Sequence, residues 1–289
     1  MGKKKPDSML VKDWMNKEVA YITLPSSRDD VLDILKKKQV SGVPVIKGGA
    51  LAGIITRVDL LKHPEEEQVA MLMSRNPVSV PPESTLAEAA KLMLKHSIRR
   101  LPVTGPKSKL MGIITIADVV KAIQDMELDD NVGGLIDSGT FAIWDETPLP
   151  VVGRIFELGF LKAAPVLNSK EELVGVITDK HLIAASRIED SVHRSDLSGT
   201  DEDQWSWESI RDTMKLYYGI SKVRLPGVPL KQIMLKSSVT CYRNSSASEC
   251  AKKMREHKLD QLPVVNAQNH LIGLLRDRDL LKALVKHAK

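Results

Sequence analysis

Hydrophobic residues in this chain fall into short runs that return at a fixed interval. In each run an apolar residue closes an early turn, a strand follows around a proline, and a glycine then opens a second apolar strand. The strands around proline read GVPVI, RLPVT, AAPVL and QLPVV, and the glycines open GIIT, GIIT, GVIT and GLLR. The apolar residues that begin the copies are Met15, Met73, Ile136 and Met234. Because such self-similarity marks repeat architectures, the sequence predicts four copies of one small structural unit.

Each copy has the pattern of a short strand, a helix, a strand, a hairpin, a second strand and a second helix. The helix expected after Thr85 has an amphipathic stripe formed by Leu86, Ala89, Ala90, Met93 and Leu94. Helix starts are marked by capping-box pairs and by a proline, at Thr85 with Glu88, Ser246 with Glu249, and Thr147 before Pro148. One such unit has a small core, so we expect units to bury their sheet faces in pairs. The predicted fold is α/β (α+β), with a small three-stranded sheet and flanking helices in each repeat.

An insertion separates the third copy from the fourth. It begins with the polar string EDSVHRSDLSGTDEDQ, which is typical of a linker. It continues as WSWESIRDTMKLYYG, which predicts an amphipathic helix with Gly219 as its C-terminal cap. The apolar stripe of this helix would be Trp207, Ile210, Met214 and Tyr217. The helix would cover its own module or provide a docking surface for another protein.

Composition narrows the class of protein further. The chain of 289 residues is 43% hydrophobic and 27% charged, and it has no apolar run long enough to cross a bilayer. No apolar stretch follows its basic start, so we expect a cytoplasmic protein without a membrane span. The two cysteines, Cys241 and Cys250, lack the spacing of a zinc site. The net charge is +5, but the basic residues do not form a long cluster in the sequence. This argues against a nucleic-acid partner.

Sequence motifs for catalysis are missing. The chain has no P-loop, no GxGxxG after a strand, no GxSxG and no HExxH. Its seven histidines are scattered and are not paired with a nucleophile or with a set of metal ligands. We therefore expect neither an enzyme nor a metal protein.

The layout of the repeat, with hPV, a hairpin, and GhhT followed by an acid, resembles the CBS domain. The four spans are 9–64, 67–126, 130–187 and 228–287, with the insertion at 188–227. Two CBS domains ordinarily pair into a Bateman module, so the chain looks like two modules in tandem. It is similar to archaeal CBS proteins and to the gamma subunit of AMP-activated protein kinase. The resemblance implies a regulatory sensor of adenosine ligands, although fold alone does not fix function.

The resemblance assigns candidate ribose-binding residues at the joint between the second strand and its helix. An ionised carboxylate there offers two acceptor oxygens to the vicinal hydroxyls of a ribose. The residues at these positions are Thr56 and Asp59, Thr115 and Asp118, and Asp279. His181 replaces the acid in the third repeat, and Arg276 replaces the hydroxyl in the fourth. The same spacing is that of a capping box, which accounts for the pairs without any ligand.

Phosphate and adenine contacts follow from the same resemblance. Arg99 and Arg100 precede the second repeat's strand and would bind phosphate, because a guanidinium makes bidentate contacts with it. The adenine would lie between apolar walls, formed in the second repeat by Val78, Ile98 and Ile113 and in the first by Ala20, Val40 and Ile54. The expected ligand is therefore AMP, ADP or ATP, and no cofactor is expected.

Other readings stay open. S-adenosylmethionine or methylthioadenosine would keep the adenosine but lack the phosphate. A nucleic-acid-binding CBS protein would show binding that weakens steeply with salt. A scaffold that docks a protein partner through the insertion around Trp207 would need no ligand at all. We expect either a homodimer or a single chain whose four repeats close into a disc.

Overall fold

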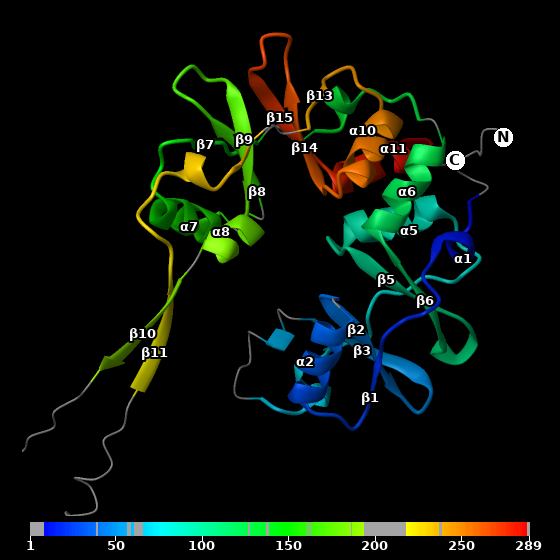
Figure 1. Cartoon of the computed structure of the whole chain (residues 1–289). Coiled ribbons are helices and arrows are strands. Elements are labelled where there is room, and N and C mark those ends of the chain that lie inside the picture. Colours follow the sequence, from blue (N-terminus) through cyan, green and yellow to red (C-terminus); the bar gives the residue numbers. More distant parts are fainter. Residues whose placement is uncertain are drawn as a thin grey trace, which may run out of the picture. The chain divides into compact units, whose positions relative to one another are not determined.

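The computed structural model describes most of the chain and divides it into two compact units (Figure 1). The first unit contains Met1–Gly139, Val239–Asn266 and Ile272–Lys289, and the second contains Thr140–Ser238 and Ala267–Leu271. The described residues are 9–38, 40–56, 59–60, 66–126, 128–136, 139–159, 161, 163–185, 187–193, 218–236 and 239–287. Among them, no helix combines the length and the apolar character needed to cross a bilayer.

Repeat 1 shows the small sheet that the sequence predicts, with one additional strand. The parallel strand β1 (Ile22–Thr23) pairs with β2 (Gly42–Lys47), which forms a hairpin with β3 (Ala50–Thr56). The helix α2 (Arg28–Lys37) covers the sheet and begins at a capping box. The fourth strand, β4 (Ser74–Arg75), pairs with β3 although it belongs to the start of repeat 2. The sheet is therefore completed by the neighbouring repeat.

Repeats 1 and 2 exchange their leading segments. The helix α1 (Val11–Trp14) starts repeat 1 but lies on repeat 2, where Val11 N donates to Ser84 O at 2.8 Å. Farther along, Asn16 and Ile113 exchange two backbone hydrogen bonds of 2.9 and 3.0 Å. In return, α4 (Val69–Leu72) precedes β4 and lies on repeat 1. Each repeat of this pair thus holds the first segment of the other.

Repeat 2 consists of the hairpin β5 (Arg100–Thr104) and β6 (Leu110–Thr115), with the short helix η2 (Pro106–Ser108) between them, and of two helices. The helix α5 (Leu86–Lys95) begins at the predicted capping box of Thr85 and Glu88. The helix α6 (Ile116–Met126) follows β6 without an intervening loop.

Repeats 3 and 4 make the same exchange. Repeat 3 contains β7 (Ile143–Trp144), α7 (Leu149–Leu158), β8 (Ala163–Leu167), β9 (Leu173–Thr178) and α8 (Asp179–Ala185). Repeat 4 contains β13 (Cys241–Tyr242), α10 (Ala247–Glu256), β14 (Gln261–Val265), β15 (Leu271–Arg276) and α11 (Asp277–His287). The segment η3 (Val132–Gly134), at the start of repeat 3, bonds to repeat 4, while η4 (Leu230–Gln232) and β12 (Leu235–Lys236), at the start of repeat 4, bond to repeat 3.

A glycine in each repeat receives the apolar residue of the exchanged segment. A β-carbon added to Gly112 would lie 2.6 Å from Met15 Sδ and 2.9 Å from Asn16 O. In the second unit, a β-carbon on Gly175 would lie 2.6 Å from the carbonyl oxygen of Leu235. The four such contacts are Met15 on Gly112, Met73 on Gly53, Ile136 on Gly273 and Met234 on Gly175. The sequence pattern is most regular at the apolar residue that begins each copy and at the glycine that opens the second strand. In the structure these two residues contact each other between paired repeats.

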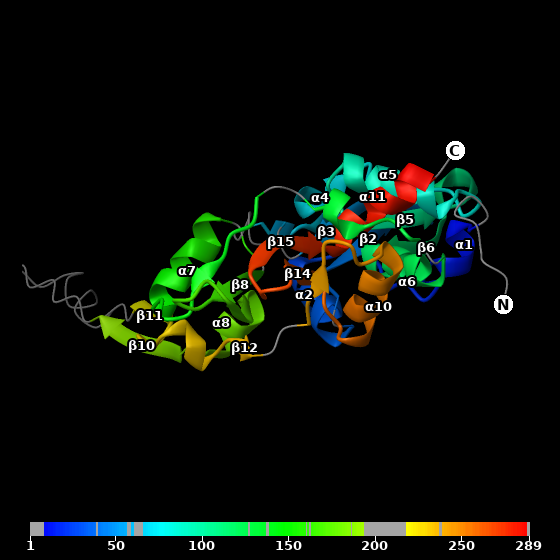
Figure 2. The same cartoon turned by 90° about the horizontal axis from the view of Figure 1, so that it is seen from above.

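The helices of repeats 2 and 4 form the largest core of the first unit. The helices α5 and α6 pack against α10 and α11, and Figures 1 and 2 both show them side by side. Their buried residues belong to one cluster that includes both cysteines, Cys241 and Cys250, as free thiols. At its edge, Ser248 Oγ donates to Ile123 O at 2.9 Å. The mixed α/β fold with small sheets and flanking helices is confirmed.

The insertion differs from its prediction where it is described. The strand β10 (Arg187–His193) pairs with β11 (Tyr218–Arg224), so the predicted linker begins as a strand. Gly219 lies in β11 opposite Val192 and is not the cap of a helix. The predicted stripe of Trp207, Ile210, Met214 and Tyr217 lies outside the described residues.

Two predicted helix starts also need correction. The helix α7 begins at Leu149 with Pro148 as its cap, one residue later than predicted. At α10, Ser246 accepts a bond from Glu249 N as predicted, but the Glu249 carboxylate pairs with Lys253 at 2.8 Å. A nearby lysine thus competes with the backbone for the carboxylate.

Replacing Gly175 with alanine should destabilise the second unit by about 1 to 3 kcal/mol, because the added methyl group overlaps a backbone oxygen that cannot turn aside. Urea unfolding followed by circular dichroism measures the change. Gly227 is the matched control, since nothing lies within 4 Å of a β-carbon placed there. Equal stability of the Gly175→Ala and Gly227→Ala variants would show that the close contact has no energetic weight.

Candidate functional site

The hydroxyl and carboxylate at the joint of repeat 2 are bonded to each other. Asp118 Oδ2 accepts from Thr115 N at 2.8 Å and from Thr115 Oγ1 at 2.6 Å. In repeat 1, Asp59 Oδ2 accepts from Thr56 N and Oγ1 at the same two distances. Both bonds end on Oδ2, so Oδ1 takes no part in them. The capping role is therefore present, and it fixes the direction of the carboxylate without using both of its oxygens.

The corresponding residues of the second pair are arranged differently. In repeat 4, Asp279 Oδ2 accepts from Arg276 N at 3.0 Å, and Lys282 Nζ lies 3.0 Å from Oδ1. The side chain of Asp279 is only 1% exposed. Its negative charge is already matched by the positive charge of Lys282. In repeat 3, Thr178 N donates to His181 Nδ1 at 3.2 Å, and the imidazole replaces the missing carboxylate as the cap.

A cleft of about 630 Å³ opens between repeats 1 and 2, within the first unit. Repeat 1 and its leading segment line it with Asn16, Lys17, Glu18, Val19, Ala20, Lys38, Val40, Gly42 and Pro44. Repeat 2 lines it with Arg100, Ile113, Thr115 and Asp118. Apolar and charged side chains thus come from both repeats, while Thr115, Asp118 and Arg100 all come from repeat 2.

The predicted adenine walls are divided differently by the structure. The cleft combines Ala20 and Val40 of repeat 1 with Ile113 of repeat 2. Val78 and Ile98 instead pack against the core that repeats 2 and 4 share, and Ile54 lies on β3 opposite Pro44. The sequence analysis assigned the adenine walls to each repeat separately. In the structure, the exchange of segments brings the first strand of one repeat beside the hairpin of its partner.

Arg100 is a half-buried cation that faces repeat 1. Its Nη1 donates to Gly42 O at 3.2 Å, and its Nη2 donates to Ser41 Oγ. Both partners are neutral, and among the described residues Arg100 has no carboxylate partner. Burial lowers the pKa of Arg100, and the neighbouring charge of Arg99 lowers it further. An anion in the cleft would relieve both effects.

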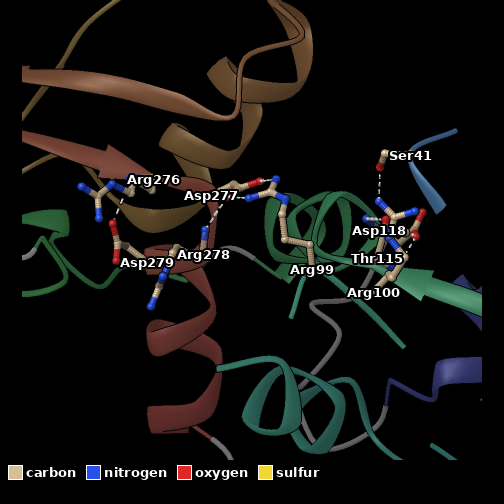
Figure 3. Close-up of polar contacts among 9 residues, drawn as sticks. All are labelled: Ser41, Arg99, Arg100, Thr115, Asp118, Arg276, Asp277, Arg278 and Asp279. Atoms are coloured by element: carbon tan, nitrogen blue, oxygen red, sulfur yellow. Dashed lines mark hydrogen bonds and ion pairs between the residues drawn. The ribbon is translucent and has the colours of Figure 1, made fainter. Parts of the chain in front are cut away.

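Arg99 points away from Arg100, toward repeat 4 (Figure 3). Its Nη1 lies 3.1 Å from Asp277 Oδ1, and its Nη2 lies 2.5 Å from Asp277 Oδ2. The Asp277 side chain is 8% exposed and that of Arg99 is 44% exposed. Burial raises the pKa of Asp277 against the pull of Arg99, while Asp277 raises the pKa of Arg99 in spite of burial. The structure thus places Arg100 at the cleft and Arg99 at the contact between repeats 2 and 4.

Asp277 is the residue of this region that the sequence analysis missed. It opens α11, and at the matching place in repeat 2 the chain has the buried Ile116. A carboxylate where repeat 2 has an isoleucine was the available signal. Its meaning depends on the packing of repeat 4 against repeat 2, which the repeat pattern does not reveal.

Comparison with known proteins gives one family. The family model described as CBS domain matches residues 11–66, 69–125, 132–188 and 230–286. An uncharacterized protein of Pyrococcus horikoshii has a similar crystal structure, with 27% identity and a TM-score of 0.70, covering 96% of this chain and 100% of that chain. Protein MJ1225 of Methanocaldococcus jannaschii is 22% identical over 94% of this chain and 98% of its own, and its structure matches with a TM-score of 0.62.

A third relative shows how widely the repeat is used. The inosine-5'-monophosphate dehydrogenase of Korarchaeum cryptofilum is 32% identical over 117 residues, which is 40% of this chain. The match spans only 24% of that enzyme's length. Most of that protein therefore has no counterpart in the aligned part of this chain.

Replacing Arg99 with methionine should destabilise the protein by about 2 to 3 kcal/mol at neutral pH, because the change leaves the buried carboxylate of Asp277 without its cation. The Arg154→Met variant is the control, since it removes an exposed pair with Glu157 and should cost at most about 0.5 kcal/mol. Urea unfolding measures both.

The cost of Arg99→Met should shrink as the pH falls toward 5. In the wild type, burial already raises the pKa of Asp277 above the 3.8 of the unfolded chain, although Arg99 pulls it down. The variant lacks this pull, so its folded state binds the proton still more readily and gains more stability than the wild type as the pH falls. The contribution of this carboxyl to stability is thus largest below that pKa and is lost as the pH rises. A double variant with Asp277→Asn in addition should lose this pH dependence. A pH-independent cost in the single variant would contradict the assignment.

Proposed function

The chain belongs to the CBS domain family, and from this premise we propose that it is a non-catalytic regulatory sensor that binds an adenosine ligand in the cleft between repeats 1 and 2. One observation supports this most directly. The cleft contains a half-buried guanidinium, that of Arg100, whose partners are neutral, beside the carboxylate and hydroxyl of Asp118 and Thr115. Such a charge favours an anionic ligand.

The proposed placement of the ligand follows from the lining. The base would lie between Ala20 and Val40 on one side and Ile113 on the other. The ribose hydroxyls would donate to Asp118, whose orientation is fixed by Thr115. The phosphate would accept from Arg100, because charge-assisted hydrogen bonds to a guanidinium are the stronger kind. The equivalent pair Thr56 and Asp59 is proposed as the ribose contact of a second ligand in this pair of repeats, and Asp279 as a weaker one in the other pair.

Among adenosine compounds, the cleft favours AMP, ADP or ATP over S-adenosylmethionine. The sulfonium centre of S-adenosylmethionine carries a positive charge, which Arg100 would repel. Lys17 and Lys38 add positive charge to the lining, opposed by Glu18 and Asp118. A phosphorylated ligand is therefore the better electrostatic match.

Ligand binding would be transmitted through the helix α6. This helix starts immediately after Thr115, and Ile116 N donates to Arg99 O at 3.0 Å. The buried face of α6 packs against the helices of repeat 4. A ligand that moves the joint of repeat 2 would thus bias the packing of repeat 4, by no more than its differential affinity for the two arrangements.

The Arg100→Gln variant should weaken AMP binding about 10- to 100-fold and leave adenosine binding within about threefold, because the lost charge-assisted bond belongs to the phosphate. Isothermal titration calorimetry of the full chain with AMP, adenosine and S-adenosylmethionine measures this. Arg154→Gln serves as the control because Arg154 pairs with Glu157 on the surface and does not line the cleft.

The Asp118→Asn variant should weaken AMP and adenosine equally, since the ribose is common to both. If wild-type protein freed of bound ligand takes up none of these adenosine compounds, the proposed function is wrong. A preference for S-adenosylmethionine that Arg100→Gln leaves unchanged would identify the alternative ligand.

A further inference from the structure

The segment 16–20 places a carboxylate in the cleft that the protein itself leaves unmatched, that of Glu18. The Glu18 carboxylate is exposed and lines the cleft, and among the described residues it has no hydrogen bond or ion pair. Its backbone is held in place, since Glu18 N donates to Asn16 Oδ1 at 2.9 Å. Asn16 is in turn bonded to Ile113 of repeat 2. The position of Glu18 is therefore fixed by both repeats.

The other carboxylate of the cleft, that of Asp118, is bonded through one oxygen and is assigned to the ribose. Asp118 accepts two bonds from Thr115 at the start of α6. Glu18 lies two residues before Ala20 on the segment that leads into β1, whereas Arg100 and Thr115 are directly opposite each other on β5 and β6. The free carboxylate thus belongs to the segment that supplies an apolar wall for the base, and the cation belongs to the hairpin beside the ribose contact.

A carboxylate next to a purine distinguishes between bases. An ionised carboxylate can only accept hydrogen bonds. The 6-amino group of adenine donates them, whereas the 6-oxo group of guanine or hypoxanthine accepts them. A 6-oxo purine would therefore place one hydrogen-bond acceptor against another, with no donor between them. A binding site that hydrogen-bonds a particular group of its ligand rejects an analogue that lacks this group.

We propose that Glu18 is a specificity-determining residue that accepts a hydrogen bond from the 6-amino group of the bound purine, so that the cleft selects adenine nucleotides against 6-oxopurine nucleotides. This inference rests on the proposed function and adds to it the side chain that reads the base. It assigns Glu18 and Arg100 to opposite ends of one ligand, with Glu18 at the base and Arg100 at the phosphate.

Titration of the full chain with AMP and with IMP tests the proposal, because the two nucleotides share ribose and phosphate and differ at position 6 of the base. Wild-type protein should bind AMP about tenfold or more tightly than IMP. In the Glu18→Gln variant the ratio should fall to about threefold or less, since the amide can also donate to a 6-oxo group. The Glu83→Gln variant removes an exposed carboxylate outside the cleft lining and should keep the wild-type ratio.

The ratio of the AMP and IMP affinities separates recognition of the base from the effect of changing the charge of the cleft. Removing a negative charge changes the attraction for phosphate equally in AMP and IMP, so an equal change of both affinities in Glu18→Gln would overturn the proposal. A wild-type ratio near one would also overturn it, while leaving the proposed function intact. Loss of S-adenosylmethionine binding in Glu18→Gln at an unchanged AMP to IMP ratio would show that Glu18 binds an amino group of the ligand's tail instead. Absence of binding by AMP, IMP and adenosine in the wild type would reject the proposed function together with this inference.

Discussion

The architecture depends on one repeated contact, in which an apolar side chain from the leading segment of one repeat rests on a glycine of its partner. At Gly112 and Gly175 even a methyl group would overlap backbone oxygen atoms of the incoming segment. The contact is reciprocal within each pair, so neither repeat completes its surroundings alone. Small domains bury little surface by themselves, and each exchanged segment adds apolar residues to the core of the repeat that receives it. The cleft between repeats 1 and 2 is a consequence, because the exchanged segment 16–20 forms one of its walls.

The joint between strand and helix shows how a structural device can also serve binding. The carboxylate of Asp118 caps the start of α6 through one oxygen and is thereby held in a fixed direction. A preorganised group loses less freedom when a ligand arrives, which improves affinity. In repeat 4 the same position has been neutralised by Lys282, which keeps the cap and gives up the free charge. The common element in these repeats is thus the cap, and the lining of each cleft determines what else it can do.

The sequence predicted the number of repeats and their register, because the same apolar positions recur at a fixed spacing in each copy. It also named Thr115, Asp118 and Arg100 as candidate ligand contacts, leaving open whether Arg100 serves Asp59 or Asp118, and the cleft brings these three residues together. It could not predict that Met15 rests on Gly112 of another repeat, because periodicity reports spacing and not partners. The same limitation caused Val78 and Ile98 to be grouped with Ile113, and it hid Asp277, whose partner is 178 residues away in sequence. The insertion was misread for a different reason, since its strands are stabilised by pairing with each other, which a helical stripe does not reveal.

Two adjacent arginines illustrate what the strand geometry adds to the sequence. Arg99 precedes β5 and Arg100 is its first residue, and their side chains point in different directions (Figure 3). Arg100 faces repeat 1, and Arg99 faces Asp277 of repeat 4. Their backbones are continuous, and the carbonyl of Arg99 is bonded to the first residue of α6. In the proposed function, an anion that displaces Arg100 would therefore act through the backbone on the ion pair of Arg99 and Asp277, which joins repeats 2 and 4. Asp277 is 8% exposed and Arg99 is 44% exposed, so separating the pair would leave the carboxylate buried without its cation, and the pair therefore resists displacement.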